Sequence, residues 1–272
     1  MCNFFILSIF VIERRFPMEK FKSVPFKEWI RERIKSDINP ILYKKGFKKG
    51  KATSYVRECN EIIQMITFQF RQDEVCLEAR ISPVYFPSDY GCISVISDKD
   101  FPISRNRIIA QNIYTQDNIG KSNWFWGTRS RTAQEWQEFE DIINKIILPQ
   151  FDIIQNLDEL MKSSMREKYN EQPNEMWKGI FLYVDAVYDC LVGDFDIGMQ
   201  KLKIAQGCKQ AYLNYLASIG KKYGKSKDNF YRIYFIIDEF CKAVIEENYK
   251  DTFLSVYEKV CDETKKWFKV RV

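Results

Sequence analysis

The sequence predicts an α+β fold: a short antiparallel sheet packed against an N-terminal helix and a long helix, followed by a C-terminal helical subdomain. Three observations predict it. Apolar residues recur every three to four positions on both sides of a central segment, and within that segment their period shortens to two. Helical patterning then returns in several pieces. We expect an α+β domain at 18–168, a helical subdomain at 169–272, and an extension at 1–17.

The first 17 residues are mostly apolar from Cys2 to Ile12, and the basic residues follow this run. The run is too short to span a bilayer, and a secretory signal would carry its basic residues first. Translation starting at Met18 would make residues 1–17 non-native. A short packed element and an export signal are the alternatives. We expect no membrane span and a cytoplasmic protein.

An amphipathic helix is predicted over residues 26–45. Its apolar face consists of Phe26, Trp29, Ile30, Ile34, Ile38, Ile41 and Leu42. Pro40 is expected to kink or restart this helix, because proline lacks a backbone N–H. Gly46 is expected to end it in the left-handed conformation, with Phe47 anchoring the exit.

Two strands with a defined register are predicted next. A tight turn at 72–73 would set Phe70 opposite Val75 and Phe68 opposite Leu77, on an apolar face continued by Ala79 and Ile81. The other face would pair Arg71 with Glu74, Thr67 with Glu78, and Met65 with Arg80. Residues 51–58 are expected to add a third strand that turns through Asn60. The sheet should therefore have one face under helices and one polar face in solvent.

The later elements follow from weaker patterns. Residues 92–96 are expected to form a fourth strand, and 98–127 mostly loop. From Thr132 the helical period predicts one long helix over 132–162, bent at Pro149. The last hundred residues should form antiparallel helix hairpins, with breaks near Gly193, Gly207, Gly224 and Lys250.

Composition argues against several classes of catalysis and metal binding. The chain has no histidine, so the side chain of most triads and imidazole metal sites is missing. Its eight cysteines form no C-x-x-C pair, which indicates reduced thiols rather than a zinc site. We expect no catalytic residues, no metal and no cofactor, and thus no enzyme. An enzyme using only carboxylates stays open, because distant acids can converge in a fold.

A lysine cluster follows the first helix. It consists of Lys44, Lys45, Lys48, Lys49 and Lys51, and residues 1–50 carry 12 Lys and Arg against 5 Asp and Glu. The remainder of the chain is slightly acidic. The cluster could meet phosphates or an acidic partner, whereas the structural alternative is that lysines complement the dipole at a helix C-terminus.

Aromatic and basic residues also concentrate just before the long helix, at Trp124, Trp126, Arg129 and Arg131. Such mixtures are typical of protein interfaces and of single-stranded nucleic-acid sites. The alternative is that both tryptophans fill the core at the end of a strand.

Several dispersed motifs carry a family resemblance: Gly46-Phe47-Lys48-Lys49, Tyr55 and Arg57, the run Gln64 to Gln69, and Leu148-Pro149. Their order over residues 24–165 resembles the bacterial domain of unknown function 4304 family. The resemblance implies the same α+β fold for this half of the chain. It implies no catalytic residues.

We therefore expect a noncatalytic module that binds another protein. By analogy, one form of this role is that of an immunity protein, which neutralises a toxin. The binding residues would lie on the polar sheet face and in the aromatic segment: Arg57, Thr67, Gln69, Glu78, Arg80, Trp124, Trp126, Arg129 and Arg131. The alternative is a nucleic-acid-associated protein, which would use the Lys44–Lys51 cluster with Arg57, Arg129 and Arg131.

Overall fold

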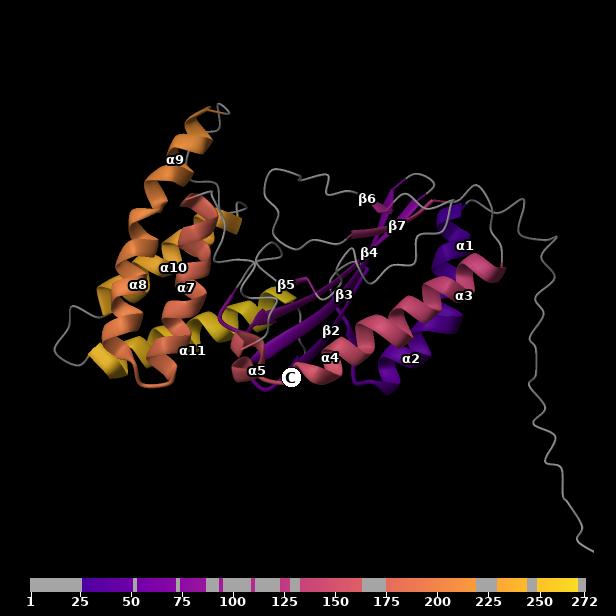
Figure 1. Cartoon of the computed structure of the whole chain (residues 1–272), viewed down its shortest axis with the longest axis horizontal. Helices are drawn as coiled ribbons and strands as arrows, with labels where there is room; N and C mark the ends of the chain where they lie inside the picture. The colour runs from indigo at the N-terminus through magenta and orange to yellow at the C-terminus, as the bar shows by residue number, and fades with distance from the viewer. Residues whose placement is uncertain are drawn as a thin grey trace, which may run out of the picture.

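A computed structural model of the chain describes residues 26–50, 53–71, 74–86, 93–94, 109–110, 123–127, 133–162, 175–218, 229–243 and 249–268. Within these residues the fold is α+β, as predicted: an antiparallel sheet lies beside two long helical segments, and further helices follow at the C-terminus (Figure 1). Residues 1–17 and the predicted domain boundary at 168 lie outside the described residues.

The first helical segment runs through Pro40 without a break. It consists of α1 (Phe26–Arg33), a π-helical turn η2 (Ile34–Ile38) and α2 (Asn39–Lys44). In the π turn Asn39 donates its N–H to the carbonyl of Ile34, five residues back. This wider turn ends at Ile38, one residue before Asn39 and Pro40. In a regular α-helix the proline ring would crowd the carbonyl four residues back. The helix thus accommodates Pro40 by a local change from α-helical to π-helical hydrogen bonding.

The helix ends as predicted at Gly46, whose φ is +83°. Phe47 donates its N–H to the carbonyl of Leu42, and Gly46 donates to that of Tyr43, both at 3.0 Å. These two bonds form a Schellman motif, and Leu42 and Phe47, at the two positions of its usual apolar contact, are both buried. The motif fixes the direction in which the chain leaves α2.

Among the described residues, seven strands of 2 to 10 residues form one sheet. They are β1 (Lys48–Lys49), β2 (Ser54–Cys59), β3 (Ile62–Arg71), β4 (Glu74–Pro83), β5 (Ile93–Ser94), β6 (Ile109–Ala110) and β7 (Asn123–Gly127). The order is β1-β2-β3-β4-β7-β6, with β5 also pairing β4, and every pair is antiparallel.

The predicted register of β3 and β4 is confirmed at each of its five pairs, from Met65 opposite Arg80 to Arg71 opposite Glu74. The turn into β3 also matches, because Asn60 has a positive φ of 34°. The predicted turn at 72–73 lies outside the described residues. The stretch 98–127 contains two strands, β6 and β7, where mostly loop was expected.

The second helical segment is shorter than predicted. α3 (Ala133–Ile142), the π turn η4 (Ile143–Ile147) and α4 (Leu148–Ile153) run through Pro149, but Ile154 is extended and a separate α5 (Leu157–Lys162) follows. Asn156 caps α5 by accepting the N–H of Glu159 at 2.9 Å. This cap competes with continuation of the helix, so one helix over 132–162 was a wrong prediction.

Both helical segments cover one face of the sheet (Figure 1). The buried side chains of this face include Ile62, Ile66, Phe68, Leu77, Ala79 and Ile81. Phe68 meets Phe139 of α3 with ring centroids 6.0 Å apart, and Trp29 of α1 meets Trp136 of α3 at 6.1 Å. The apolar face is therefore under helices, as expected.

Five described helices form the C-terminal region: α7 (Glu175–Leu191), α8 (Phe195–Gly207), α9 (Lys209–Ser218), α10 (Asn229–Ala243) and α11 (Tyr249–Phe268). Gly193, with φ +103°, separates α7 from α8 as predicted, and the break expected near Gly224 lies outside the described residues. No described helix is both long and apolar enough to cross a membrane.

The helical region and the sheet share one hydrophobic core. The segment after β4 joins them, because Tyr183 of α7 donates its hydroxyl to the carbonyl of Tyr85 at 2.7 Å, and Tyr85 donates to the carbonyl of Val184 at 3.0 Å. Phe86 also lies against Tyr183, with ring centroids 6.3 Å apart. The C-terminal helices are therefore packed onto the sheet.

Candidate binding surface

The polar face of the sheet is not free in solvent. Glu78 and Arg80 are 6% and 8% exposed, and Ser82 beside them on β4 is 1% exposed. Met65, the cross-strand neighbour of Arg80, is also buried. The predicted docking surface at Glu78 and Arg80 is therefore wrong, since a partner cannot reach side chains that are already covered.

A buried ion pair explains how this face tolerates burial. Glu78 and Arg80 lie two residues apart on the same side of β4, and a guanidinium nitrogen of Arg80 lies 2.6 Å from Glu78 Oε2. Each charge compensates the other, which a buried charge requires. The same polar alternation thus fits an exposed face or a buried, paired one, and the sequence pattern does not distinguish them.

Helix α11 covers one end of this face (Figure 1). Lys265 Nζ lies 2.6 Å from Glu58 Oε1 on β2, and Tyr257 donates to Glu61 at 3.4 Å. A Cβ added to Gly50 would lie 3.4 Å from the carbonyl oxygen of Phe268. The sheet is therefore packed on both sides at this end.

Other predicted site residues have local partners or lie outside the description. Thr67 is half-buried, and its hydroxyl lies 3.0 Å from that of Ser54. Gln69 lies opposite Cys76, and β7 places Trp124 opposite Leu77 and Trp126 opposite Val75. Arg129, Arg131 and Lys51 lie outside the described residues.

Arg57 belongs to a structural network that joins three elements. It donates to Gln64 Oε1 at 2.7 Å and to the carbonyl of Lys45 at 2.9 Å, and it lies 3.4 Å from Asp152. Gln64 in turn donates to the carbonyls of Phe151 and Ile154 at 2.7 Å each, which satisfies the C-terminal end of α4. Arg57 therefore holds the helices to the sheet.

Lys45 is engaged in the same network, with its Nζ 2.8 Å from Asp152 Oδ2. The hydrogen bond from Lys45 lowers the pKa of the Asp152 carboxyl, with a further contribution from Arg57. Two of the basic residues predicted to bind a partner, Lys45 and Arg57, are therefore paired with Asp152 of this chain.

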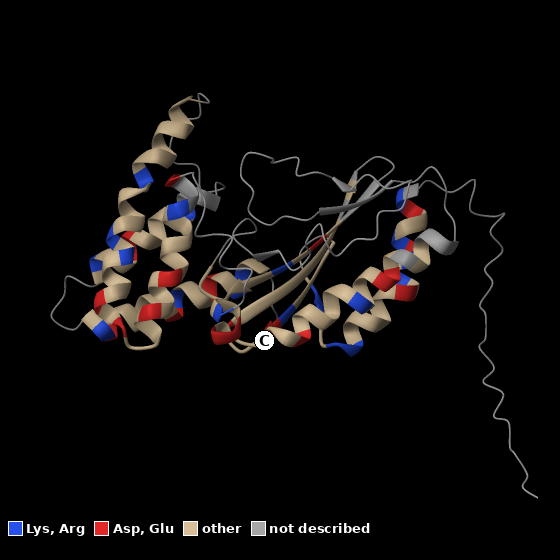
Figure 2. Ribbon diagram, viewed as in Figure 1, with Lys and Arg blue, Asp and Glu red and all other residues tan. Residues whose placement is uncertain are grey.

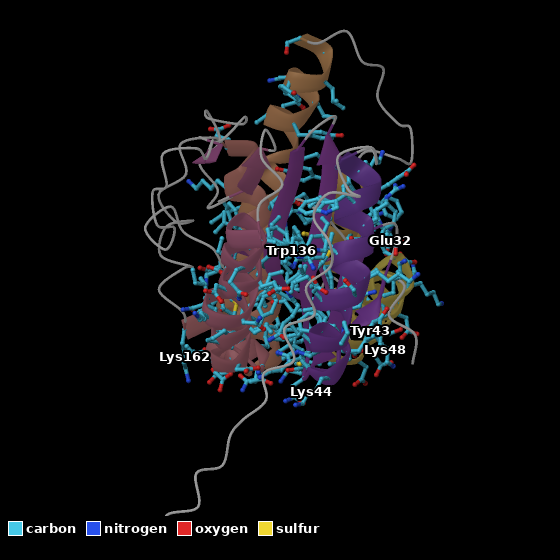
Figure 3. The ribbon with its side chains drawn as sticks, turned by 90° about the vertical axis from the view of Figure 1, so that its right-hand side faces the viewer. Glu32, Tyr43, Lys44, Lys48, Trp136 and Lys162 are labelled. Atoms are coloured by element: carbon cyan, nitrogen blue, oxygen red, sulfur yellow. The ribbon has the colours of Figure 1, made fainter. Side chains whose placement is uncertain are left out.

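The remaining lysines of the cluster form an exposed corner of the molecule. Lys44 at the end of α2 and Lys48 and Lys49 in β1 are all exposed, and the neighbouring Tyr43 is 49% exposed. Figure 2 shows basic ribbon where α2 passes into β1, and Figure 3 shows Tyr43, Lys44 and Lys48 near the same end. We call Tyr43, Lys44, Lys48 and Lys49 the basic corner.

The Schellman motif at Gly46 creates this corner, because it turns the chain from α2 directly into the sheet edge. Tyr43 was missed by the sequence reasoning. It follows the apolar face of the helix at a position where a tyrosine suits a core, and its ring lies 6.3 Å from that of Tyr55. Its side chain is nevertheless 49% exposed at the end of α2.

The described residues offer little to metal or thiol chemistry. They contain no group of three cysteines or carboxylates placed to hold a metal ion. Burial raises the pKa of Cys190 to about 12, and those of Cys241 and Cys261 to about 11. These thiols are protonated near neutral pH, so they are poor nucleophiles.

The chain was compared with protein-family models, curated proteins and solved structures. No match was found in any of the three. The resemblance to the domain of unknown function 4304 family therefore stays a prediction, and the geometry of the basic corner is the main guide to function.

Proposed function

We propose that this chain is a noncatalytic, cytoplasmic binding protein that receives an acidic surface of another protein at the basic corner. The observation that carries the proposal is the exposure of Lys44, Lys48 and Lys49 beside the half-exposed ring of Tyr43. An exposed tyrosine is typical of protein-recognition surfaces. Lysines act differently: they are ordinarily depleted from the centre of an interface, but around it they would speed encounter with an acidic partner. An immunity-type role is one form of this proposal.

A protein partner fits the corner better than a nucleic acid does. Binding along a nucleic-acid backbone commonly neutralises about 6–10 phosphates, which requires a broad basic surface. Of the basic residues predicted for that role, Arg57 and Lys45 are held by Asp152 and Gln64. Three exposed lysines match a small group of carboxylates more closely.

Comparative affinity capture tests the proposal. Wild-type protein, the corner variant K44E/K48E/K49E and the control K145E/K203E/K242E would be immobilised and exposed to lysate of the source cells, with and without nuclease treatment. The control reverses three exposed lysines elsewhere, so the net charge changes equally. We expect a protein that wild type and control retain and that the corner variant loses. Equal retention by all three, or retention that disappears with nuclease treatment, would contradict the proposal.

A further inference from the structure

Helices α8 and α9 expose a row of large apolar side chains. Ile197 and Ile204 of α8 and Tyr215 of α9 are 50%, 52% and 51% exposed. They are 7 and 11 residues apart in the sequence, and both spacings are close to whole numbers of helical turns. In a continuous helix the three side chains therefore lie on one side. We call Ile197, Ile204 and Tyr215 the apolar stripe.

The two helices are nearly continuous. Cys208, the residue between them, keeps right-handed helical dihedral angles, and Ala211 donates its N–H to the Cys208 carbonyl at 3.1 Å. Figure 1 shows α8 and α9 nearly end to end, with α9 extending beyond the neighbouring helices. The apolar stripe therefore follows about 27 Å of helix. Single exposed apolar residues are common, but an ordered row of this length is typical of an interaction surface.

The charged residues beside the stripe have partners within the chain. Lys201 lies one turn from both isoleucines, and its Nζ is 2.5 Å from Asp189 Oδ2 on α7. Lys209, at the start of α9, is paired with Asp238 of α10. The exposed residues of α9 itself are uncharged: Gln210, Asn214, Tyr215, Ala217 and Ser218. An acidic partner would gain little from this surface, whereas an uncharged, apolar one fits it.

A second copy of the chain presents such a surface, because the stripe is complementary to itself in an antiparallel pair. With a two-fold axis beside Gln206, Ile197 of each copy lies opposite Tyr215 of the other. The two Ile204 side chains then lie on either side of the axis. Gly207 is exposed next to the axis, and it carries no side chain that would hold the two helices apart.

The same register keeps like charges apart. The exposed Lys203 of one copy lies opposite the uncharged Gln210 of the other, and Gln200 lies opposite Asn214. A two-fold contact needs this property, because every charge of the patch is present twice in it.

We propose that the chain self-associates through α8 and α9 as an antiparallel, two-fold pair. This inference goes beyond the proposed function, because the apolar stripe and the basic corner lie at opposite ends of the molecule (Figure 1). Self-association would leave the basic corner accessible to another protein. The contact contains three half-exposed apolar side chains from each copy, so it belongs to the small, weak class of interfaces and depends on concentration.

Sedimentation equilibrium of the full chain, over about a hundredfold range of concentration, tests this pairing. We expect wild type to show a monomer–dimer equilibrium. The variant I204E places two carboxylates beside the axis and should weaken dimerisation by about tenfold or more. The matched control F235E/L254E replaces apolar residues of similar exposure on α10 and α11, and it should dimerise as wild type does.

Mixing two charge variants tests the register. I204E and I204K should each dimerise weakly alone, and an equimolar mixture should dimerise about tenfold or more strongly than either, because opposite charges then meet beside the axis. A mixture no stronger than its components would overturn the two-fold pairing.

Other outcomes would overturn self-association altogether. A wild type that stays monomeric throughout, or an I204E variant that dimerises as wild type does, would contradict it. A monomeric wild type whose I204E variant loses a captured protein would assign the stripe to a different partner.

Discussion

Arg57 shows how neighbouring groups can remove one side chain from a predicted binding surface. The sequence places it near the lysine cluster, but the fold surrounds it with Gln64, Asp152 and the Lys45 carbonyl. Asp152 lies 95 residues further along the chain, so no local pattern could have predicted this contact. Glu78 and Arg80 are a second example. Their polarity predicts exposure, but their ion pair with each other allows both side chains to be buried.

Glu140 provides a prediction about pH at the residue scale. Burial raises the pKa of its carboxyl; Asp37 and Asp141 raise it further, while the hydrogen bond from Trp136 and the charge of Arg33 lower it. Because the pKa is higher in the folded state, the folded protein binds more protons, and the free energy of unfolding falls as pH rises through this range. The variant E140Q should therefore gain stability relative to wild type as the pH rises from the ordinary range of a glutamate pKa toward neutrality.

Urea unfolding at several pH values measures this difference. The glutamine oxygen can still accept the hydrogen bond from Trp136 Nε1, which is 2.7 Å from Glu140 Oε1 in the wild type. The variant E32Q, at an exposed position of α1, shows the general effect of losing one negative charge. A relative stability of E140Q that falls with rising pH would contradict the account.

At the scale of elements, the sequence predicted most where spacing alone determines the outcome. Alternation in β3 and β4 fixed their register, and Gly46 with Phe47 fixed the end of α2. The sequence predicted less where two local signals compete. At Asn156 the helical spacing of apolar residues favours a continuous helix, but the side chain of Asn156 caps a new helix, α5, and the long helix is interrupted. The strand β7 was expected only as a possible strand end at Trp124 and Trp126, because Phe125 between them is also aromatic and polar residues do not alternate with them; β7 forms by pairing with β4.

The α7–α8 hairpin yields a stability prediction. The two helices pack closely because α8 has a glycine at the contact: a Cβ at Gly198 would lie 2.4 Å from Cys190 Sγ and 2.6 Å from the Ala186 carbonyl oxygen. The variant G198A must push the helices apart, although alanine favours a helix. We expect a loss of about 1–3 kcal/mol in the free energy of unfolding.

Gly207, at the end of the same helix, provides the matched control. A Cβ there meets nothing within 4 Å, so G207A should be neutral or stabilise the protein by up to about 1 kcal/mol. Chemical unfolding of both variants measures the contrast. Equal effects of the two substitutions would show that helix propensity, rather than close packing, governs this hairpin.

At the scale of the whole molecule, the sheet is packed more completely than the sequence indicated. The sequence predicted helices on the apolar face, but α11 also reaches Glu58 and Glu61 on the polar side. Helix patterning predicted that α11 exists, whereas its docking depends on contacts between residues about 200 positions apart, such as Tyr257 and Glu61. With that face occupied, Lys44, Lys48 and Lys49 of the predicted basic cluster are still exposed among the described residues.

Amine-reactive footprinting of the free protein and of its complex with the captured partner tests the central claim most directly. The exposed Lys44, Lys48 and Lys49 should react readily in the free protein and become protected in the complex. The exposed Lys203 and Lys242 should react equally in both states. Protection of Lys203 and Lys242 with continued reaction at the basic corner would contradict the account.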